Sequence, residues 1–209
     1  MLLYYITDRR QFQGTEAERR ERLLAKISEA ARCGVDLVQL REKDLATCEL
    51  EFLAHEAIKK IRAAGATTRL LINSRVDVAL AVGADGLHLR SRDISPEEVR
   101  RIWNLAAGPG TPMIAVSCHT EEEVRVSAQA RADYAVFAPI FEKTGTPQLL
   151  GLERLRAACR HEIPVLALGG IQVENARSCI QAGAKGIAAI RLFQENQIQE
   201  LIAELRSLD

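Results

Sequence analysis

Four stretches of the sequence resemble one another and recur at nearly regular intervals. They are "CGVDLVQLR", "VGADGLHLR", "ARADYAVFA" and "AGAKGIAAI", which begin at residues 33, 82, 130 and 182. Each reads as the end of a helix, a turn of small residues and then a strand, so one unit holds two strand–helix modules. Four such units predict an α/β protein, a single (β/α)8 TIM barrel with one domain over residues 1–209. A doubly wound open sheet is the alternative, but it does not need a fourfold repeat.

Short apolar runs alternate with amphipathic stretches along the chain. We expect strands at 2–7, 37–41, 69–73, 86–89, 113–117, 134–140, 165–170 and 186–191. Helical patterns cover 16–32, 47–64, 95–106, 120–130 and 194–207. Ser95-Pro96 and Thr120 favour helix starts, because a hydroxyl accepts hydrogen bonds from free amides and proline suits the first turn.

The charge balance and the cysteines exclude several classes of function. The 28 basic residues balance 28 acidic ones, so nothing favours binding to nucleic acid or to an anionic membrane, and any anion site must be local. The five cysteines are scattered without a C-x-x-C pair, which argues against disulfides or zinc and favours the reducing cytoplasm. The apolar start of the chain ends at Asp8, too early for a signal peptide or a membrane span.

The segment "LVQLREKD", residues 37–44, carries polar residues in alternation. Alternation in a strand places Gln39, Arg41 and Lys43 on one face. The reactive face of a TIM barrel lies at the C-terminal ends of its strands, where this segment ends. Arginine binds phosphate through two hydrogen bonds and lysine binds it as a point charge, so we predict an anionic ligand here. The alternative is an ion pair within the protein, with Glu42, Asp44 or Asp93.

Polar residues also follow the other expected strands. Two of these strands end in Asn73 and Ser117. Asp93 could hold Mg²⁺ beside phosphates, or it could cap the helix that begins near 95. His119 could move a proton, or it could cap the helix that begins at 120. His88 is expected to be a hydrogen-bonded core histidine rather than a catalyst.

The pair Gly169-Gly170 ends the seventh expected strand. The loops after the seventh and eighth strands form the usual phosphate site of a TIM barrel, and glycine lets backbone amides approach phosphate oxygens. Glycine pairs also make plain turns, which is the alternative. Two phosphate-binding regions on one rim indicate two phosphorylated ligands or one long one, and two ligands imply group transfer with a phosphate leaving group.

Six motifs together resemble thiamine phosphate synthase and its TenI-type relatives, from about residue 3 to residue 195. They are "YYITDR", "VQLREK", "LLINSRVDVALAVGADGLHL", "SCHTEEEV", "FAPIFEKTGT" and "ALGGI". The resemblance implies a TIM barrel that joins 4-amino-5-hydroxymethyl-2-methylpyrimidine diphosphate to a thiazole phosphate. Diphosphate leaves with the help of Mg²⁺, and the thiazole nitrogen captures the resulting pyrimidine-methyl cation. The implied partners are small phosphorylated substrates, and the oligomeric state is not predicted.

The resemblance also assigns roles to residues of this chain. Pyrimidine diphosphate would contact Gln39, Arg41, Lys43, Asn73 and Ser117. Asp93 matches a magnesium ligand, and Gly169-Gly170 matches the turn that holds the thiazole phosphate. We predict that the catalytic residues are Arg41, Lys43, Ser117 and His119.

Four departures from the family pattern alter the expected site. Ser74 stands where the synthases carry a second magnesium-binding aspartate, and "RSR" precedes Asp93. In the shortened loop "EKTGTPQ" only Lys143, which is shifted, could replace the lysine that clamps diphosphate. Arg191 replaces a phosphate-binding serine. Together these changes make the site more cationic.

Two other functions are compatible with this family. A TenI-type tautomerase carries out an aromatising proton shift on a thiazole carboxylate phosphate without a metal, and it needs an acid/base residue near the ring. The histidine expected for that role is Pro139 here, which leaves His119 as the nearby replacement. A non-catalytic regulator that binds the same ligands is the third possibility.

Overall fold

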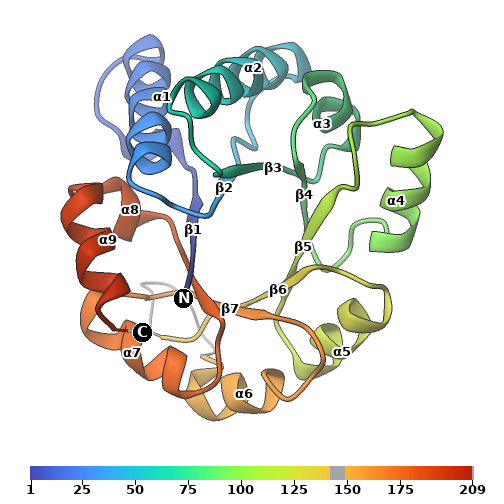
Figure 1. Cartoon of the computed structure of the whole chain (residues 1–209), viewed down its shortest axis with the longest axis vertical. Coiled ribbons are helices and arrows are strands. Elements are labelled where there is room, and N and C mark those ends of the chain that lie inside the picture. The colour runs from blue at the N-terminus through green and yellow to red at the C-terminus, as the bar shows by residue number, and fades with distance from the viewer. Residues whose placement is uncertain (142–148, 209) are drawn as a thin grey trace.

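The computed structural model describes residues 1–141 and 149–208, and within them eight parallel strands close into a barrel (Figure 1). Each strand pairs with the next, and β8 pairs with β1. The strands are β1 (Leu2–Ile6), β2 (Leu37–Leu40), β3 (Arg69–Asn73), β4 (Gly86–Leu89), β5 (Met113–Cys118), β6 (Tyr134–Phe137), β7 (Val165–Leu168) and β8 (Gly186–Ala189). This confirms the predicted (β/α)8 TIM barrel and excludes the open sheet.

Helices surround the barrel, and their starts follow the predicted caps. They are α1 (Glu16–Arg32), α2 (Thr47–Ala63), α3 (Val76–Val82), α4 (Pro96–Leu105), α5 (Glu121–Gln129), α6 (Gly151–Ala158), α7 (Val173–Gln181), α8 (Arg191–Gln194) and α9 (Ile198–Arg206), with a 3-10 turn η1 (Arg9–Gln11). The hydroxyls of Ser95 and Thr120 accept hydrogen bonds from the amides three residues on, at 3.2 and 3.1 Å. None of the helices described here is long and apolar enough to cross a membrane.

The helix predicted over 194–207 is observed, but it begins later than predicted, at Ile198. The chain forms α8, breaks, and restarts as α9. The side chain of Gln194 accepts from the amide of Asp8 at 2.9 Å and donates to its carbonyl at 3.1 Å, which ties the end of α8 to the loop after β1. The amide of Ile198 donates to Glu29, so α9 begins against α1. The spacing of apolar residues along the chain cannot predict such contacts between distant segments.

Three predicted strands, 134–140, 165–170 and 186–191, extend beyond the observed ones. Pro139 follows β6 and has no N–H to donate to a neighbouring strand. Gly169 follows β7 with φ +100°, and Ile190 follows β8 with a helical backbone. The chain therefore leaves the sheet at these points and turns over the rim of the barrel.

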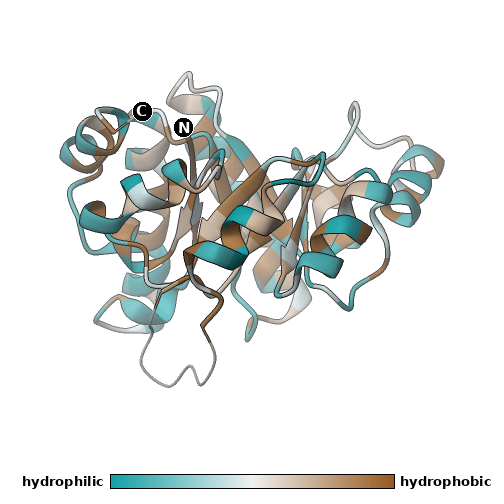
Figure 2. Ribbon diagram, turned by 90° about the horizontal axis from the view of Figure 1, so that it is seen from below, coloured by the Kyte–Doolittle hydropathy of each residue, from teal (hydrophilic) through white to brown (hydrophobic). Residues whose placement is uncertain are grey.

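Apolar side chains fill the barrel and separate it from the helices. One buried cluster lies inside the barrel and is formed by Tyr4, Ile6, Leu37, Leu71, Ala115, Val136, Leu166 and Ala188. A larger cluster packs the outer strand faces against the helices. Figure 2 shows the hydrophobic residues along the strands and the hydrophilic ones on outer helix faces. Burial of this apolar surface drives the chain into the barrel.

The fourfold repeat has a structural counterpart at the N-terminal end of the barrel. An aspartate stands directly before β2, β4 and β6, and its carboxylate accepts a hydrogen bond from a backbone amide of the preceding strand. The pairs are Asp36 with Leu3 at 2.8 Å, Asp85 with Leu70 at 2.8 Å and Asp133 with Ile114 at 2.7 Å. We call these three contacts the aspartate clamps.

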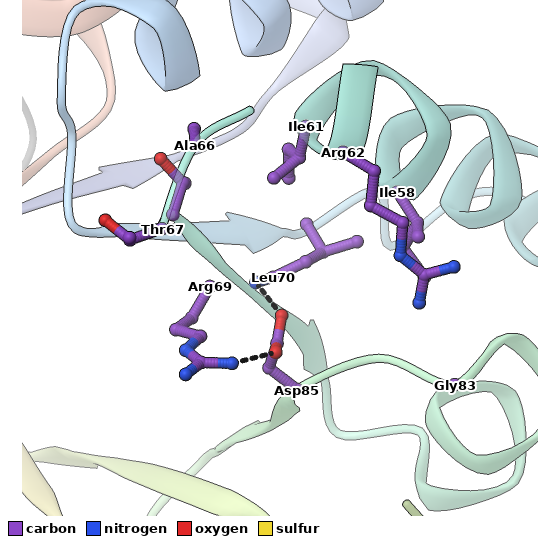
Figure 3. Close-up of a pocket in the computed structure, with 10 residues that line it drawn as sticks. Ile58, Ile61, Arg62, Ala66, Thr67, Arg69, Leu70, Gly83 and Asp85 are labelled. Carbon is purple, nitrogen blue, oxygen red and sulfur yellow. Dashed lines mark hydrogen bonds and ion pairs between the residues drawn. The ribbon is translucent and has the colours of Figure 1, made fainter. Parts of the chain in front are cut away.

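Each clamp carboxylate also forms an ion pair at 2.9 Å, with Arg206, Arg69 or Arg100. Figure 3 shows the pair of Arg69 and Asp85 in a surface cavity of about 410 Å³ beside α2 and β3. The polar groups there stabilise strand pairing. In the fourth repeat Lys185 occupies the equivalent position before β8, so this clamp is missing.

We expect the clamps to contribute measurably to stability. Asp85→Ala should lower the free energy of unfolding by about 2 kcal/mol, because it removes a charge-assisted hydrogen bond to a strand amide. Lys185→Asp should raise it by roughly 1 kcal/mol by supplying the missing carboxylate. Urea unfolding monitored by circular dichroism measures both changes.

Asp77→Ala is the matched control, because the Asp77 carboxylate is 62% exposed and pairs only with Arg75 within the described residues. Asp77→Ala should lower the free energy of unfolding by less than about 1 kcal/mol. Equal losses for Asp85→Ala and Asp77→Ala would contradict a special role for the clamps.

Candidate active site

A cavity of about 620 Å³ opens at the C-terminal ends of the strands. On the side formed by β2 to β5 and the loops that follow them it is lined by polar residues, Gln39, Arg41, Lys43, Asn73, His88, Arg90, Ser91, Arg92, Ser117 and His119. The opposite side is apolar and contains Ile6, Ala138, Pro139, Leu168 and Ile190. A cavity divided in this way suits a ligand with an anionic group and an apolar ring.

Arg41 and Lys43 lie in this cavity without an ion-pair partner among the described residues, although the negative charge of Asp8 acts on both of them. Within residues 1–141 and 149–208 neither side chain makes a hydrogen bond or an ion pair. Burial lowers the pKa of Arg41. Burial, together with the positive charges of Arg41 and Arg90, lowers the pKa of Lys43. Two neighbouring cations that lack partners favour an anionic ligand.

Among residues 1–141 and 149–208, the alternative of an internal ion pair for Arg41 and Lys43 is not observed. Glu42 and Asp44 both pair with Arg9, at 3.1 and 2.8 Å. Hydrogen bonds from Arg9 lower the pKa of Asp44 to about 2. Both carboxylates are therefore committed to Arg9 as ion-pair partners, although the negative charge of Glu42 still acts on Arg41.

Glu42 lies between the two cations in the sequence but points the opposite way. It is buried, and it accepts hydrogen bonds from the Thr7 hydroxyl at 2.6 Å and from the Arg9 amide at 3.1 Å. The Thr7 hydroxyl also accepts from the Arg41 amide at 2.9 Å. Anchoring Glu42 leaves Arg41 and Lys43 on the cavity side. The sequence analysis missed this role, although the continued alternation of the strand pattern at position 42 was a signal for it.

Removing the Glu42 carboxylate should destabilise the protein and loosen the cationic rim. We expect Glu42→Ala to cost about 3 kcal/mol of unfolding free energy, because the Thr7 hydroxyl and the Arg9 amide then lack their buried acceptor. Chemical denaturation measures the loss. Glu16→Ala is the control, since Glu16 also pairs with Arg9 but is 46% exposed, and it should cost less than about 1 kcal/mol. A smaller loss for Glu42→Ala than for Glu16→Ala would refute this assignment.

A chain of hydrogen bonds runs along the polar side of the cavity. The Gln39 amide donates to Asn73 at 2.9 Å, and the Asn73 amide donates to the Ser74 hydroxyl at 3.3 Å. Ser74 donates in turn to the Asp93 carboxylate at 2.5 Å. Ser74 has φ +58°, a left-handed backbone that few side chains tolerate. The structure thus brings the predicted residues Gln39, Asn73 and Asp93 together, although their roles toward a ligand stay predictions.

The Asp93 carboxylate is fully engaged within the protein. Oδ1 accepts from the Arg90 guanidinium at 2.8 and 3.0 Å, and Oδ2 accepts from the Arg90 amide and from Ser74. Burial tends to raise the pKa of Asp93, but the hydrogen bonds from Arg90 and Ser74 outweigh it and lower the pKa. The cap of α4 is Ser95, so the alternative role of Asp93 as that cap is wrong.

These contacts bear on the predicted Mg²⁺. Among the described residues no group of three or more histidine, cysteine, aspartate or glutamate side chains could hold a metal ion. A single carboxylate fits Mg²⁺ only if phosphate oxygens and water complete the octahedral shell. The described residues alone therefore offer a poor site for Mg²⁺.

His119 lines the cavity and does not cap α5, because the Thr120 hydroxyl does. Its Nδ1 lies 2.8 Å from the Ala138 carbonyl, which can only accept, so Nδ1 carries the proton. In the neutral tautomer that this contact selects, Nε2 has a lone pair that can accept a proton.

Gly169 and Gly170 lie at a smaller hollow beside the main cavity, between β7 and β8, and Arg191 lines it too. A Cβ on Gly169 would lie 2.8 Å from Pro139 Cα, and its φ is +100°, so only glycine fits. The Gly170 amide makes no hydrogen bond with the described part of the chain. The assignment of this hollow as a phosphate site stays a prediction. Lys143, the remaining predicted contact, lies outside the described residues.

The chain is similar to known proteins over nearly its whole length. The family model described as thiamine monophosphate synthase matches residues 3–193. A putative thiamine-phosphate synthase 2 of Aquifex aeolicus is 39% identical, over 92% of this chain and 97% of the relative. A thiamine-phosphate synthase of Syntrophomonas wolfei is 38% identical, over 99% of this chain and 95% of the relative.

The solved structures agree. A thiamine phosphate pyrophosphorylase from Pyrococcus furiosus has a TM-score of 0.81 and 30% identity, over 99% of this chain and 94% of that one. A 3-hexulose-6-phosphate synthase has a TM-score of 0.70 at 13% identity, which shows a shared fold alone. The chain therefore belongs to the thiamine monophosphate synthase family.

Proposed function

We propose that the protein is a thiamine-phosphate synthase, a transferase that joins pyrimidine diphosphate to thiazole phosphate and releases diphosphate. The observation that carries the proposal is a pair of cations, Arg41 and Lys43, that have no ion-pair partner among the described residues and face an apolar cavity wall in a chain of this family. A leaving diphosphate needs the cations, and a flat heterocycle suits the apolar wall. The five free thiols fit a cytoplasmic location, which belongs to the same proposal.

The proposed reaction has two bond changes. The bond between the pyrimidine methylene carbon and the diphosphate oxygen breaks, and its electron pair leaves with the diphosphate. The lone pair of the thiazole nitrogen then forms the new carbon–nitrogen bond. Arg41 and Lys43 stabilise the charge that develops on the leaving group, and this stabilisation is a major part of the catalysis.

Other residues hold the two substrates close to each other. Gln39, Asn73 and Ser117 are placed to contact the diphosphate. The Gly170 amide and Arg191 are placed to hold the thiazole phosphate in the hollow between β7 and β8. Such positioning contributes to the rate because it converts an encounter of two molecules into a reaction within one complex.

We propose that Asp93 would hold Mg²⁺ together with the diphosphate, and that it would exchange hydrogen bonds from Arg90 or Ser74 for the ion. When bound, the ion neutralises negative charge on the leaving diphosphate. Because one carboxylate is available, the affinity of the free protein for Mg²⁺ should be low.

A tautomerase is the second candidate, and the state of His119 favours it. The lone pair on Nε2 could remove a proton from a thiazole carboxylate phosphate bound in the same cavity. This reaction needs neither a second substrate nor a metal.

Incubation with both synthase substrates and Mg²⁺ should yield thiamine phosphate, detected by mass spectrometry. Arg41→Met should lower kcat about 100-fold, because the leaving group loses a preorganised charge. Arg101→Met is the control, since Arg101 is 61% exposed on α4 and pairs with Glu98. If no thiamine phosphate forms but the thiazole proton exchanges, the result would favour the tautomerase. If the protein binds the ligands without either reaction, the result would favour a regulator.

Ser74→Asp should tighten Mg²⁺ binding in the absence of diphosphate and raise the rate at low Mg²⁺. Aspartate tolerates the left-handed backbone of position 74, and a second carboxylate beside Asp93 attracts the cation. Isothermal titration with MgCl2 measures the affinity. Ser74→Asn, which is neutral and suits the same backbone, should leave it weak. Equal tightening by both variants would show that charge is not the cause.

A further inference from the structure

His88 lies on β4 at the floor of the main cavity, 2% exposed. Its Nδ1 is 2.8 Å from the Tyr4 hydroxyl on β1, and its Nε2 is 2.8 Å from the Ser117 hydroxyl on β5. The histidine thus connects a buried phenol with a hydroxyl that lines the cavity. This confirms the prediction that His88 is a buried histidine with hydrogen-bond partners.

The direction of these two hydrogen bonds follows from burial. Tyr4 is fully buried, and within the described residues its hydroxyl has no partner other than His88. If the phenol only accepted, its own hydrogen would have no acceptor in a dry interior, which is costly. Tyr4 therefore donates to Nδ1.

The imidazole carries one proton, and it sits on Nε2. Burial, together with the positive charge of Arg41, lowers the pKa of His88 from 6.5 to about 3, although the charge of Asp93 acts in the opposite direction. The ring is therefore neutral near neutral pH, and since Nδ1 accepts from Tyr4, the proton is on the other nitrogen. Nε2–H then donates to Ser117 Oγ, which leaves the serine hydrogen free for another acceptor.

We propose that Tyr4 and His88 form a relay that fixes Ser117 as a hydrogen-bond donor toward an anionic oxygen in the cavity. The identity of that anion as a leaving diphosphate rests on the proposed function. A serine hydroxyl next to an anion stabilises it only when it donates. The relay excludes the competing arrangement, in which Ser117 donates to the histidine, and so prepares the site before the ligand binds. Tyr4 and His88 are positioning residues in this account, because they act through Ser117.

The tautomer can be measured without any activity. In protein with ¹⁵N-labelled histidine, the imidazole shifts of His88 near neutral pH should show a protonated Nε2 and an unprotonated Nδ1. Tyr4→Phe removes the donor to Nδ1, so its spectrum should show a population with the proton on Nδ1. A wild-type ring protonated on Nδ1 would overturn the relay.

A double-mutant cycle tests whether Tyr4 acts through Ser117. Isothermal titration with inorganic diphosphate should show that Tyr4→Phe weakens diphosphate binding about 10-fold when Ser117 is present. In the Ser117→Ala background the same change should have less than about a 2-fold effect, since no hydroxyl remains to be oriented. If the phenol only supports the structure, Tyr4→Phe should reduce the diphosphate affinity equally in both backgrounds, and that result would refute the proposal. Failure of the wild type to bind diphosphate would also refute it.

Two His88 variants distinguish the effect of orienting the Ser117 hydroxyl from the effect of filling the space that the imidazole occupies. His88→Gln keeps an N–H donor with a similar reach toward Ser117 and should restore most of the diphosphate affinity that His88→Leu loses. Circular dichroism shows whether each variant is folded, and equal losses in folded Gln and Leu variants would count against the relay. If the wild type makes no thiamine phosphate yet passes these tests, the proposed function fails and the relay stands.

Discussion

The hydrogen bond between an aspartate carboxylate and the amide of the preceding strand, repeated three times, sets the alignment of the barrel. It ties β1 to β2, β3 to β4 and β5 to β6 at their N-terminal ends. A parallel strand that slipped by one residue would turn its inward side chains outward. Fixing the lower ends therefore determines which side chains face inward at the upper ends, where Gln39, Asn73, His88 and Ser117 line the cavity.

The rim above this framework separates charges that have partners from charges that do not. Behind it, Arg9 is buried among carboxylates and holds Glu42 away from the cavity. In front of it, Arg41 and Lys43 lack ion-pair partners among the described residues, and the charges of Asp8 and Glu42 do not outweigh their desolvation, so a bound anion would offset it further. The segment 41–43 thus supplies both the buried anchor, Glu42, and the two cations that face the cavity, Arg41 and Lys43.

The sequence predicted the architecture and most of the residues that meet at the rim, because repeats and strand alternation are local patterns. It did not predict the contacts that orient these residues. Tyr4 and His88 are far apart in the chain, as are Thr7 and Glu42, and their pairing depends on barrel closure. The break between α8 and α9 was missed for the same reason, since Gln194 is tied to Asp8 across the molecule. The family resemblance marked Asp93 as a metal ligand, but it could not reveal that Arg90 already occupies both of its oxygens.

Lys185 leaves the pair β7–β8 without an aspartate clamp, and this asymmetry has a dynamic consequence. The quarter of the barrel that lacks this carboxylate contact at its lower end also carries the Gly169-Gly170 hollow at its upper end. Local opening is easiest where few contacts oppose it, so amide hydrogens of β7 and β8 should exchange with solvent before those of β1 to β6. A phosphate bound between the upper ends of β7 and β8 would slow that exchange, and the ligand would then complete the closure of the barrel that the fourth repeat leaves weakest.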